Sequence, residues 1–355
     1  MESSAYPMLF SPIKVGTTEV KNRVFMPPVS TNLADHGYVT DDLVDHYRAR
    51  AKGGVGLIIT EVVTVEPTYT YLPGDMCCYD DTFIPGWEKL AAAVHEYGCK
   101  IMPQLFHPAY MAFNIPGTPR LIAPSFVGPS YAREAPRPIT VDEIHELTHQ
   151  FGDAAVRMQK AGVDGVEVHA AHAHGMLGGF LTPLYNKRTD EYGGSFENRV
   201  RYALEVVAAI KEAAPQLMVE YKLPVIMENP DGTPRGKGGL QPDEACEFAK
   251  LLEGAGIDMI QVAQANHTGN MGDTIPPMGA MPYNWTLPVA ERAKALVSVP
   301  VATVGRVVSV EAGEKILEDG AADIIAYGRS LMCDPDIALK AATGEPIREC
   351  LNCNK

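Results

Sequence analysis

Eight short runs of apolar and β-branched residues recur along the chain, separated by longer stretches in which apolar and polar positions mix. Each run has the length of one strand and is apolar enough to be buried on both faces, as strands of a parallel sheet are. The predicted strands are Asn22–Val29, Val55–Glu61, Lys100–Phe106, Val163–His169, Leu217–Leu223, Ile257–Ala263, Val299–Val304 and Asp323–Ala326.

The stretches between these runs carry apolar residues at the three- and four-residue spacing of amphipathic helices. Helices are expected at Thr40–Lys52, Pro85–Tyr97, Val141–Lys160, Phe196–Ala213, Gln241–Glu253, Thr286–Val297, Val308–Glu318 and Pro335–Ala342. Eight alternating units predict a closed (β/α)8 barrel, the TIM-barrel fold, over residues 1–345. An open doubly wound sheet is disfavoured because no Gly-x-Gly-x-x-Gly follows the first strand.

Composition and charge indicate a globular protein and limit the kinds of molecule that it binds. The 355 residues are 46% hydrophobic and 21% charged, which is typical of a globular protein. A formal charge of −14 argues against nucleic acid as a partner. The apolar runs are too short to span a membrane and the N-terminus lacks a signal-peptide pattern, so we expect a cytoplasmic protein. The scattered cysteines predict reduced thiols rather than a disulfide framework.

Three histidines, His169, His172 and His174, follow the fourth predicted strand directly. In a barrel, the carboxyl ends of strands form the active site, so this position favours a chemical role over simple packing. His172 and His174 have the H-x-H spacing of metal ligands, which leaves a metal-dependent hydrolase as an alternative. The remaining strand ends argue against it because they supply no further histidine, and a lysine ammonium would repel a cation; they carry Glu61, Gln104, Lys222 and Gln264.

The strand ends instead favour an anionic, planar ligand. Gln104 offers an amide and Lys222 a positive charge, which together suit the heterocycle of a reduced flavin. Glycine-arginine pairs follow the last two strands, where barrels commonly bind phosphate. The pairs are Gly305–Arg306 and Gly328–Arg329, and with the other two residues they suit FMN.

The segment DGVEVHAAHAHGMLGGFLTPLYNKRTDEYGGSFENR resembles the signature region of the Old Yellow Enzyme family, in the branch of NADH:flavin oxidoreductases that includes 2-enoate and 2,4-dienoyl-CoA reductases. The resemblance extends over nearly the whole chain. It includes the stretches KNRVFMPPVSTNLA, GGVGLIITE, QLFH, VPVATVGRV and DIIAYGRSLMCDPD. The family is a (β/α)8 barrel that binds FMN, in agreement with the strand count.

The resemblance implies a role for each matching residue. Pro28 and Ser30 would lie against the flavin near its N5 and O4 edge, and Val62 would back the ring. Gln104 and Lys222 would contact the pyrimidine end of the flavin. The phosphate would be held by Gly305, Arg306, Gly328 and Arg329.

His169 and His172 match the pair that binds the substrate carbonyl in the family. Two donors on one oxygen polarise an α,β-unsaturated carbonyl while its β-carbon accepts hydride from reduced FMN. The implied activity is therefore that of an ene-reductase acting on a small unsaturated enoate, enone or enoyl thioester, with NAD(P)H as the ultimate electron donor. A flavin-binding module without its own catalysis is a second alternative, and a homo-oligomer is compatible with the sequence.

The chain departs from the family pattern at the presumed proton donor. His174 stands where many relatives carry tyrosine, and His267, Tyr110 and Tyr185 are further candidates. Lys222 replaces a more common arginine, and HPAYM replaces the usual Gly-Arg after QLFH. Aromatic and apolar residues in the long loops are candidate walls of the substrate site; they are Tyr110, Phe113, His267 and Met271.

The segment 346–355 carries a second motif, in which Cys350 and Cys353 form a C-x-x-C. In larger members of this branch the barrel is followed by a four-cysteine [4Fe–4S] motif and then by FAD- and nicotinamide-binding parts. The segment matches the beginning of that motif, and two thiolates cannot hold a cluster that needs four. We therefore expect the barrel of a longer enzyme, with [4Fe–4S] and FAD only in the full-length parent.

Overall fold

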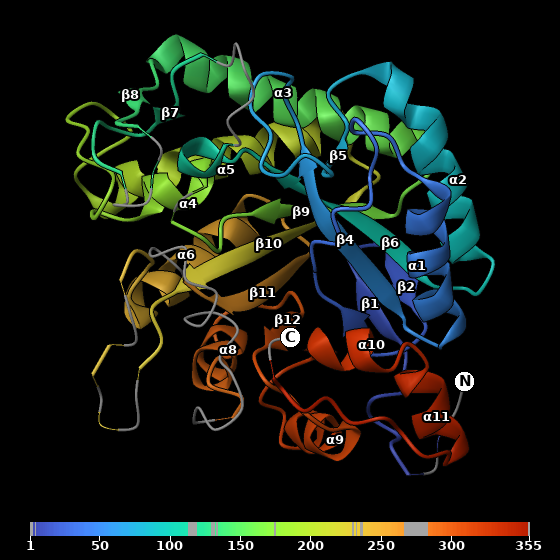
Figure 1. Ribbon diagram of the computed structural model, residues 1–355. Coiled ribbons are helices and arrows are strands. Elements are labelled where there is room, and N and C mark those ends of the chain that lie inside the picture. Colours follow the sequence, from blue (N-terminus) through green and yellow to red (C-terminus); the bar gives the residue numbers. More distant parts are fainter. Residues whose placement is uncertain are drawn as a thin grey trace.

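The computed structural model describes residues 3, 5–112, 119–128, 132, 134–173, 175–228, 231, 233–234, 237–265 and 283–353. Eight parallel strands close into a barrel, because β3 pairs with both β13 and β4 (Figure 1). The predicted (β/α)8 barrel and its eight strands are confirmed. The barrel strands are β3 (Val24–Met26), β4 (Leu57–Thr64), β6 (Lys100–Phe106), β9 (Gly165–His169), β10 (Met218–Val225), β11 (Met259–Gln264), β12 (Val301–Val304) and β13 (Ile324–Ala326).

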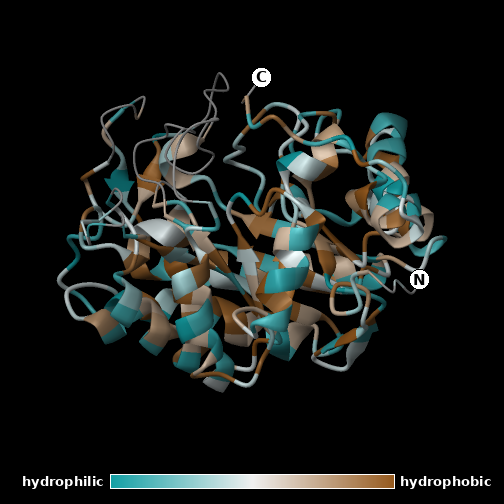
Figure 2. Cartoon of the chain, turned by 90° about the horizontal axis from the view of Figure 1, so that it is seen from below, coloured by the Kyte–Doolittle hydropathy of each residue, from teal (hydrophilic) through white to brown (hydrophobic). Residues whose placement is uncertain are grey.

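Helices surround this barrel and cover its outer face with their apolar sides (Figure 2). Hydroxyl side chains cap several of them at the expected positions, since Thr40, Ser195 and Ser309 each accept a hydrogen bond from the backbone of the first turn. The main helices are α1 (Asp41–Lys52), α2 (Ile84–His95), α3 (Val141–Lys160), α5 (Phe196–Ala213), α6 (Pro242–Gly254), α8 (Leu287–Lys294), α9 (Val310–Glu318) and α11 (Ile337–Thr343).

A short hairpin that the sequence did not predict joins the apolar floor of the barrel. Its strands, β1 (Ile13–Val15) and β2 (Thr18–Val20), pair in antiparallel fashion. Three apolar side chains of the hairpin pack in one cluster with inward-facing residues at the amino ends of the barrel strands. The cluster consists of Ile13, Val15, Val20, Phe25, Leu57, Ile59, Met102, Met218, Met259, Ala302 and Ile324.

The barrel interior turns polar toward the carboxyl ends of the strands. Side chains two positions apart on a strand share a face. Met218 belongs to the apolar floor, so Glu220 and Lys222 lie above it inside the barrel, and all three are buried. The same alternation places Gln104 above Met102 and Gln261 above Met259.

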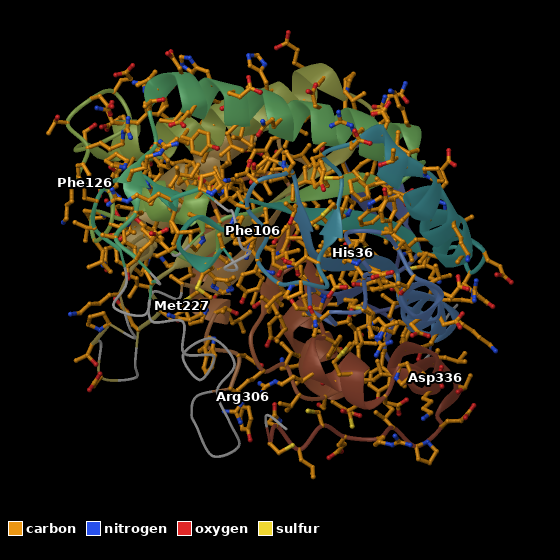
Figure 3. The ribbon with its side chains drawn as sticks, turned by 45° about the horizontal axis from the view of Figure 1, so that its top comes forward. His36, Phe106, Phe126, Met227, Arg306 and Asp336 are labelled. Carbon is orange, nitrogen blue, oxygen red and sulfur yellow. The ribbon has the colours of Figure 1, made fainter. Side chains whose placement is uncertain are left out.

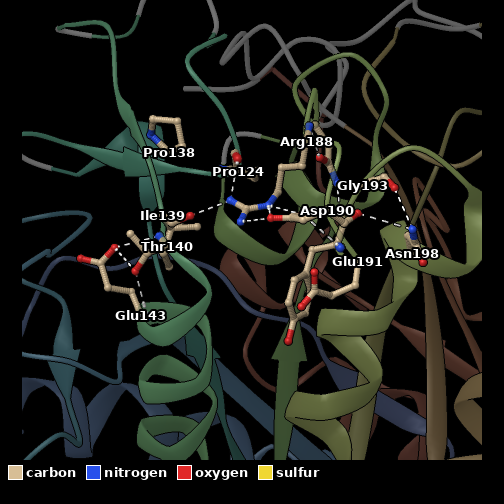
Figure 4. Close-up of polar contacts among 12 residues, drawn as sticks. Pro124, Pro138, Ile139, Thr140, Glu143, Arg188, Asp190, Glu191, Gly193 and Asn198 are labelled. Atoms are coloured by element: carbon tan, nitrogen blue, oxygen red, sulfur yellow. Dashed lines mark hydrogen bonds and ion pairs between the residues drawn. The ribbon is translucent and has the colours of Figure 1, made fainter.

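The part of the signature segment around Arg188 lies outside the barrel strands and holds the elements next to them, whereas the beginning of the segment forms the barrel strand β9. The guanidinium of Arg188 donates to the carbonyl of Ile139 at 2.6 Å and to that of Pro124 at 3.1 Å, and it pairs with Asp190 at 2.6 Å (Figure 4). Arg188 therefore ties the start of α3 to the segment that precedes α5. The smaller elements nearby are α4 (Met176–Leu181), β7 (Ile122–Ala123) and β8 (Arg137–Pro138).

Two negative findings concern the described residues alone. None of their helices is long and apolar enough to cross a bilayer. All seven cysteines are described and free, in agreement with the expectation of reduced thiols.

Replacing Arg188 should destabilise the fold. Arg188→Ala leaves two carbonyl groups and Asp190 without their cationic donor, so we expect a loss of about 2–4 kcal/mol in the free energy of unfolding. Chemical denaturation measures this loss. Lys187→Ala removes the exposed neighbouring cation and should change stability by less than about 0.5 kcal/mol. Equal effects of the two substitutions would contradict the structural role of Arg188.

Candidate active site

A cavity of about 410 Å³ opens at the carboxyl ends of the barrel strands. All nine residues predicted to bind the cofactor line it, together with His169 and His172. Figure 3 labels two of its residues, Phe106 at the end of β6 and Arg306 in the loop after β12. The lining comprises Pro27, Pro28, Val29, Ser30, Val62, Tyr71, Leu72, Gln104, Phe106, Met111, His169, Ala171, His172, Lys222, Ala263, Gln264, Trp285, Val304, Gly305, Arg306, Val307, Ala326, Gly328, Arg329, Ser330 and Asn352.

A buried glutamate anchors the loop that contains Pro28 and Ser30. The carboxylate of Glu61 accepts hydrogen bonds from the Thr31 backbone N–H, from the Thr31 hydroxyl at 2.8 Å and from the Asn32 N–H at 3.3 Å. Glu61 sits at an irregularity in the pairing of β4 with β6, between Ile59 and Val62. This irregularity lets β4 present Val62 to the cavity while Glu61 holds the neighbouring loop.

Gln104 and Lys222 are positioned by contacts within the barrel. The Gln104 amide donates to Glu167, and the Lys222 ammonium donates to Gln261 Oε1 at 2.8 Å. Lys222 Nζ also lies 3.7 Å from Glu167 Oε2. Both side chains are therefore held from below and face the cavity with their remaining polar groups.

Positive charge gathers at the end of the cavity formed by β12 and β13. Arg306 and Arg329 both line this end of the cavity, and burial, together with the positive charge of Arg306, lowers the pKa of Arg329. Arg306 is also stacked over the Tyr283 ring at 4.3 Å. Gly305 has φ +148°, and a Cβ there would lie 3.0 Å from the Trp285 indole nitrogen. The glycine thus allows Trp285 to pack closely against the backbone at this corner.

The two histidines lie beside each other at the end of β9. Their ring centroids are 5.1 Å apart with an interplanar angle of 88°, and Phe106 packs against His169 at 4.9 Å. A helix packs closely under this turn, since a Cβ on Gly178 of α4 would lie 2.1 Å from the His172 carbonyl oxygen. Burial lowers the pKa of His172 to about 4, and Lys222 adds to this effect. His172 is therefore neutral at neutral pH and donates through a single N–H.

The described residues do not support the metal alternative. They contain no group of three or more histidine, cysteine, aspartate or glutamate side chains arranged to hold a metal ion. His174, the third member of the proposed ligand set, lies outside the described residues.

Of the other predicted proton donors and wall residues, the structure describes Tyr110 and Tyr185. Tyr110 and Tyr185 pack against each other at 5.3 Å, and neither lines the cavity, which corrects their assignment to its mouth. The Tyr110 hydroxyl instead donates to the Val127 carbonyl at 2.9 Å. His267, Phe113 and Met271 lie outside the described residues.

The structure supplies walls that the sequence did not indicate, namely Tyr71, Leu72, Met111 and Trp285. Tyr71 packs edge to face on Phe106, with ring centroids 5.9 Å apart. Asp75 accepts a hydrogen bond from the Leu72 N–H at 2.7 Å and so holds this turn. Burial raises the pKa of Asp75 to about 7, and the Glu61 carboxylate contributes to the rise.

The C-x-x-C segment also reaches the cavity. Asn352 lies between Cys350 and Cys353, is buried, and lines the cavity in a left-handed conformation with φ 53°. Asn352 and Arg329 line the same cavity, so the segment passes beside its cationic end.

A family model matches nearly the whole chain. The model of the NADH:flavin oxidoreductase / NADH oxidase family matches residues 8–347. The chain belongs to this family. The predicted resemblance to the Old Yellow Enzymes is thereby confirmed, and the cavity lies where the family's flavin chemistry is expected from the barrel geometry.

The chain is similar in sequence to two reductases and in structure to a third. The chain is 43% identical to a bilirubin reductase of Mediterraneibacter gnavus over 98% of its own length and 54% of that protein. It is 34% identical to a cinnamate reductase of Clostridium sporogenes over 99% of its length and 55% of that protein. The structure of a 2-naphthoyl-CoA reductase in complex with 2-naphthoyl-CoA superimposes with a TM-score of 0.87 at 27% identity, over 99% of this chain and 54% of that one. The chain thus spans about half the length of these relatives.

The shifted pKa of Asp75 gives a test of the turn that carries Tyr71 and Leu72. A carboxyl whose pKa is about 7 when folded, against about 3.9 when unfolded, binds more protons in the folded state, so its contribution to stability falls as pH rises between these values. The difference in unfolding free energy between the unchanged protein and Asp75→Asn should therefore shift in favour of the variant from about pH 4 to about pH 7, then stay level. Denaturation series at several pH values measure it. A difference independent of pH would contradict the burial of this carboxyl.

Proposed function

We propose that the cavity binds FMN and that the protein is an FMN-dependent oxidoreductase that reduces the activated C=C bond of an α,β-unsaturated carbonyl compound. The observation that carries the proposal is the convergence on one cavity of an amide, an ammonium, two guanidinium groups and a histidine pair from five different strand ends. The family to which the chain belongs supports the flavin, and the names of its relatives support reduction of an acceptor.

The residues present fit FMN at both of its ends. Arg306, Arg329 and the backbone of Gly305 and Gly328 form a cationic, open corner that suits the phosphate. Lys222, at the other side of the cavity, suits the end of the ring that gains negative charge on reduction. When bound, FMN supplies the hydride for the reaction.

His169 and His172 would bind the substrate carbonyl oxygen through their N–H groups. The neutral imidazole of His172 still donates through one N–H, which stabilises the negative charge that develops on the carbonyl oxygen. Phe106 packs on His169 and, with Tyr71, forms an aromatic wall beside the pair. This wall restricts the orientation of a flat, conjugated substrate and excludes water from the carbonyl.

The α-carbon then requires a proton from the opposite side of the substrate. His174 remains our proposed donor. Tyr71 is a second candidate, since it lines the cavity and carries a phenolic hydroxyl close to the aromatic wall. A loss of substrate reduction in Tyr71→Phe with retained substrate binding would assign the role to Tyr71.

Cys350 and Cys353 are proposed as two ligands of an iron–sulfur cluster that takes part in the delivery of electrons from NAD(P)H. The position of Asn352 at the cavity supports this proposal, because it brings the cysteine pair to the cofactor site. The described residues do not complete a cluster, since they contain no third suitable ligand beside the pair. The FAD of a longer parent is likewise a proposal.

Removing the guanidinium of Arg306 should weaken the binding of FMN more than the binding of a flavin that lacks the phosphate. Arg306→Ala should raise the Kd for FMN by about 10- to 100-fold, because a charge-assisted contact to phosphate is worth roughly 1.5–3 kcal/mol. The variant should lose far less affinity for riboflavin, which lacks the phosphate. Fluorescence titration of both flavins measures the two values, with Arg292→Ala, an exposed arginine of α8, as the control. Equal losses for FMN and riboflavin would place the phosphate elsewhere.

Replacing a residue of the histidine pair should weaken substrate binding while FMN stays bound. His172→Ala should reduce the affinity for unsaturated acids and ketones by about tenfold or more, since one of two donors to the carbonyl is lost. The change in the flavin absorption spectrum on adding such a compound measures this affinity. His149→Ala on the exposed face of α3 should have no effect. A full spectral response in the His172→Ala protein would favour a flavin-binding module whose chemistry lies elsewhere.

A further inference from the structure

Two glutamates lie side by side in the polar layer beneath the cavity. Glu167 on β9 and Glu220 on β10 are register partners on adjacent parallel strands, and both are fully buried. Glu167 accepts from the Gln104 amide, and Glu220 Oε1 accepts from Gln261 Nε2 at 2.9 Å. Lys222 connects the two branches, since it donates to Gln261 at 2.8 Å and lies 3.7 Å from Glu167 Oε2.

This network contains more negative charge than positive charge. Lys222 is the cation that acts on both carboxyls, whereas Gln104 and Gln261 are neutral. The next inward residue on β9 is His169, and the neutral His172 faces Lys222 from above. Two ionised carboxylates in a water-free layer would repel each other, and one lysine would not compensate both.

Each of the two carboxyls has one oxygen without a hydrogen-bond partner, and these oxygens indicate how the repulsion is avoided. Glu167 Oε2 and Glu220 Oε2 are both buried, and neither has a hydrogen-bond partner among the described residues. A single proton on either carboxyl turns one of these oxygens into a donor for its neighbour, which removes the repulsion and satisfies both groups. Burial and the charge of Glu167 raise the pKa of Glu220 well above its usual value, in the direction that retains such a proton.

We propose that Glu167 and Glu220 share one proton at neutral pH, and that the single negative charge left on the pair, held against Lys222, sets how readily a flavin in the cavity is reduced. This inference rests on the proposed binding of FMN. A fixed negative charge below the ring disfavours the gain of negative charge on reduction, whereas Lys222 favours it. The carboxyl pair thus acts through Lys222 as a positioning and charge-balancing element, without contact with the substrate.

A double-mutant cycle on the flavin reduction potential tests the proposal. In Glu167→Gln or Glu220→Gln the remaining carboxyl ionises and keeps the single negative charge, so each single variant should change the potential little. Glu167→Gln combined with Glu220→Gln removes the charge. At a fixed potential it should raise the ratio of reduced to oxidised flavin by about tenfold, which is ~30 mV for two electrons. Glu212→Gln, an exposed substitution on α5, is the control.

Each departure from this pattern has a distinct meaning. Single variants that each raise the potential, with additive effects in the double variant, would show two ionised carboxylates and overturn the shared proton. A double variant with an unchanged potential would show that the pair does not act on the cavity, which also overturns the proposal. Failure of the unchanged protein to bind FMN would instead refute the proposed function from which the inference starts.

Infrared spectroscopy of the flavin-free protein provides a measurement that does not need the double variant to fold. At pH 8 the unchanged protein should show the C=O stretch of a protonated, buried carboxyl. Asp75→Asn should retain this band, which separates it from Asp75, another carboxyl whose pKa burial raises. Either Glu167→Gln or Glu220→Gln should abolish it, because the remaining carboxylate is ionised against Lys222. Absence of the band from the unchanged protein would overturn the proposal.

Discussion

The ammonium of Lys222 inside the upper barrel is the charge on which the arrangement of the site depends. It is buried, it reaches the cavity, and it contacts Gln261 and Glu167 from below. The cost of burying a cation in this environment is high unless acceptors surround it. The polar layer of the barrel satisfies that need, and the same charge adds to the burial that lowers the pKa of His172. One buried cation therefore influences both the expected cofactor end and the expected substrate end of the cavity.

The sequence predicted the architecture well because a closed barrel leaves a strong pattern. Buried parallel strands are continuously apolar and helices between them are amphipathic, so all eight strands could be found. The rule that chemistry lies at strand carboxyl ends then selected residues such as Gln104, Lys222 and Gly305, and all of them line the cavity. The hairpin formed by β1 and β2 was missed because strands of three residues are too short to show a period.

The polar layer inside the barrel could not be predicted, because the sequence does not show which residues of neighbouring strands meet. Glu167 stands inside an apolar run, where its charge appears as an interruption of a strand, and only the register of β9 with β10 shows that it meets Glu220. Assignments in loops were less successful, since the position of a residue after a strand does not determine which way its loop turns. Tyr110 follows β6 closely but packs on Tyr185 outside the cavity, whereas Tyr71, far from any predicted strand end, lines it.

The signature motif and the polar layer represent two different kinds of constraint. Arg188 and its carbonyl acceptors hold segments outside the barrel, whereas the beginning of the same signature segment supplies His169 and His172 to the cavity. The loops at the mouth are tied to each other more locally, through Asn32, whose side chain accepts from the Gly74 N–H at 2.8 Å, and through Glu61. The position of Tyr71 and Leu72 relative to Pro28 and Ser30 thus depends on a few hydrogen bonds between neighbouring loops. Sequence changes in these loops can therefore reshape the mouth of the cavity while the charges beneath it remain the same.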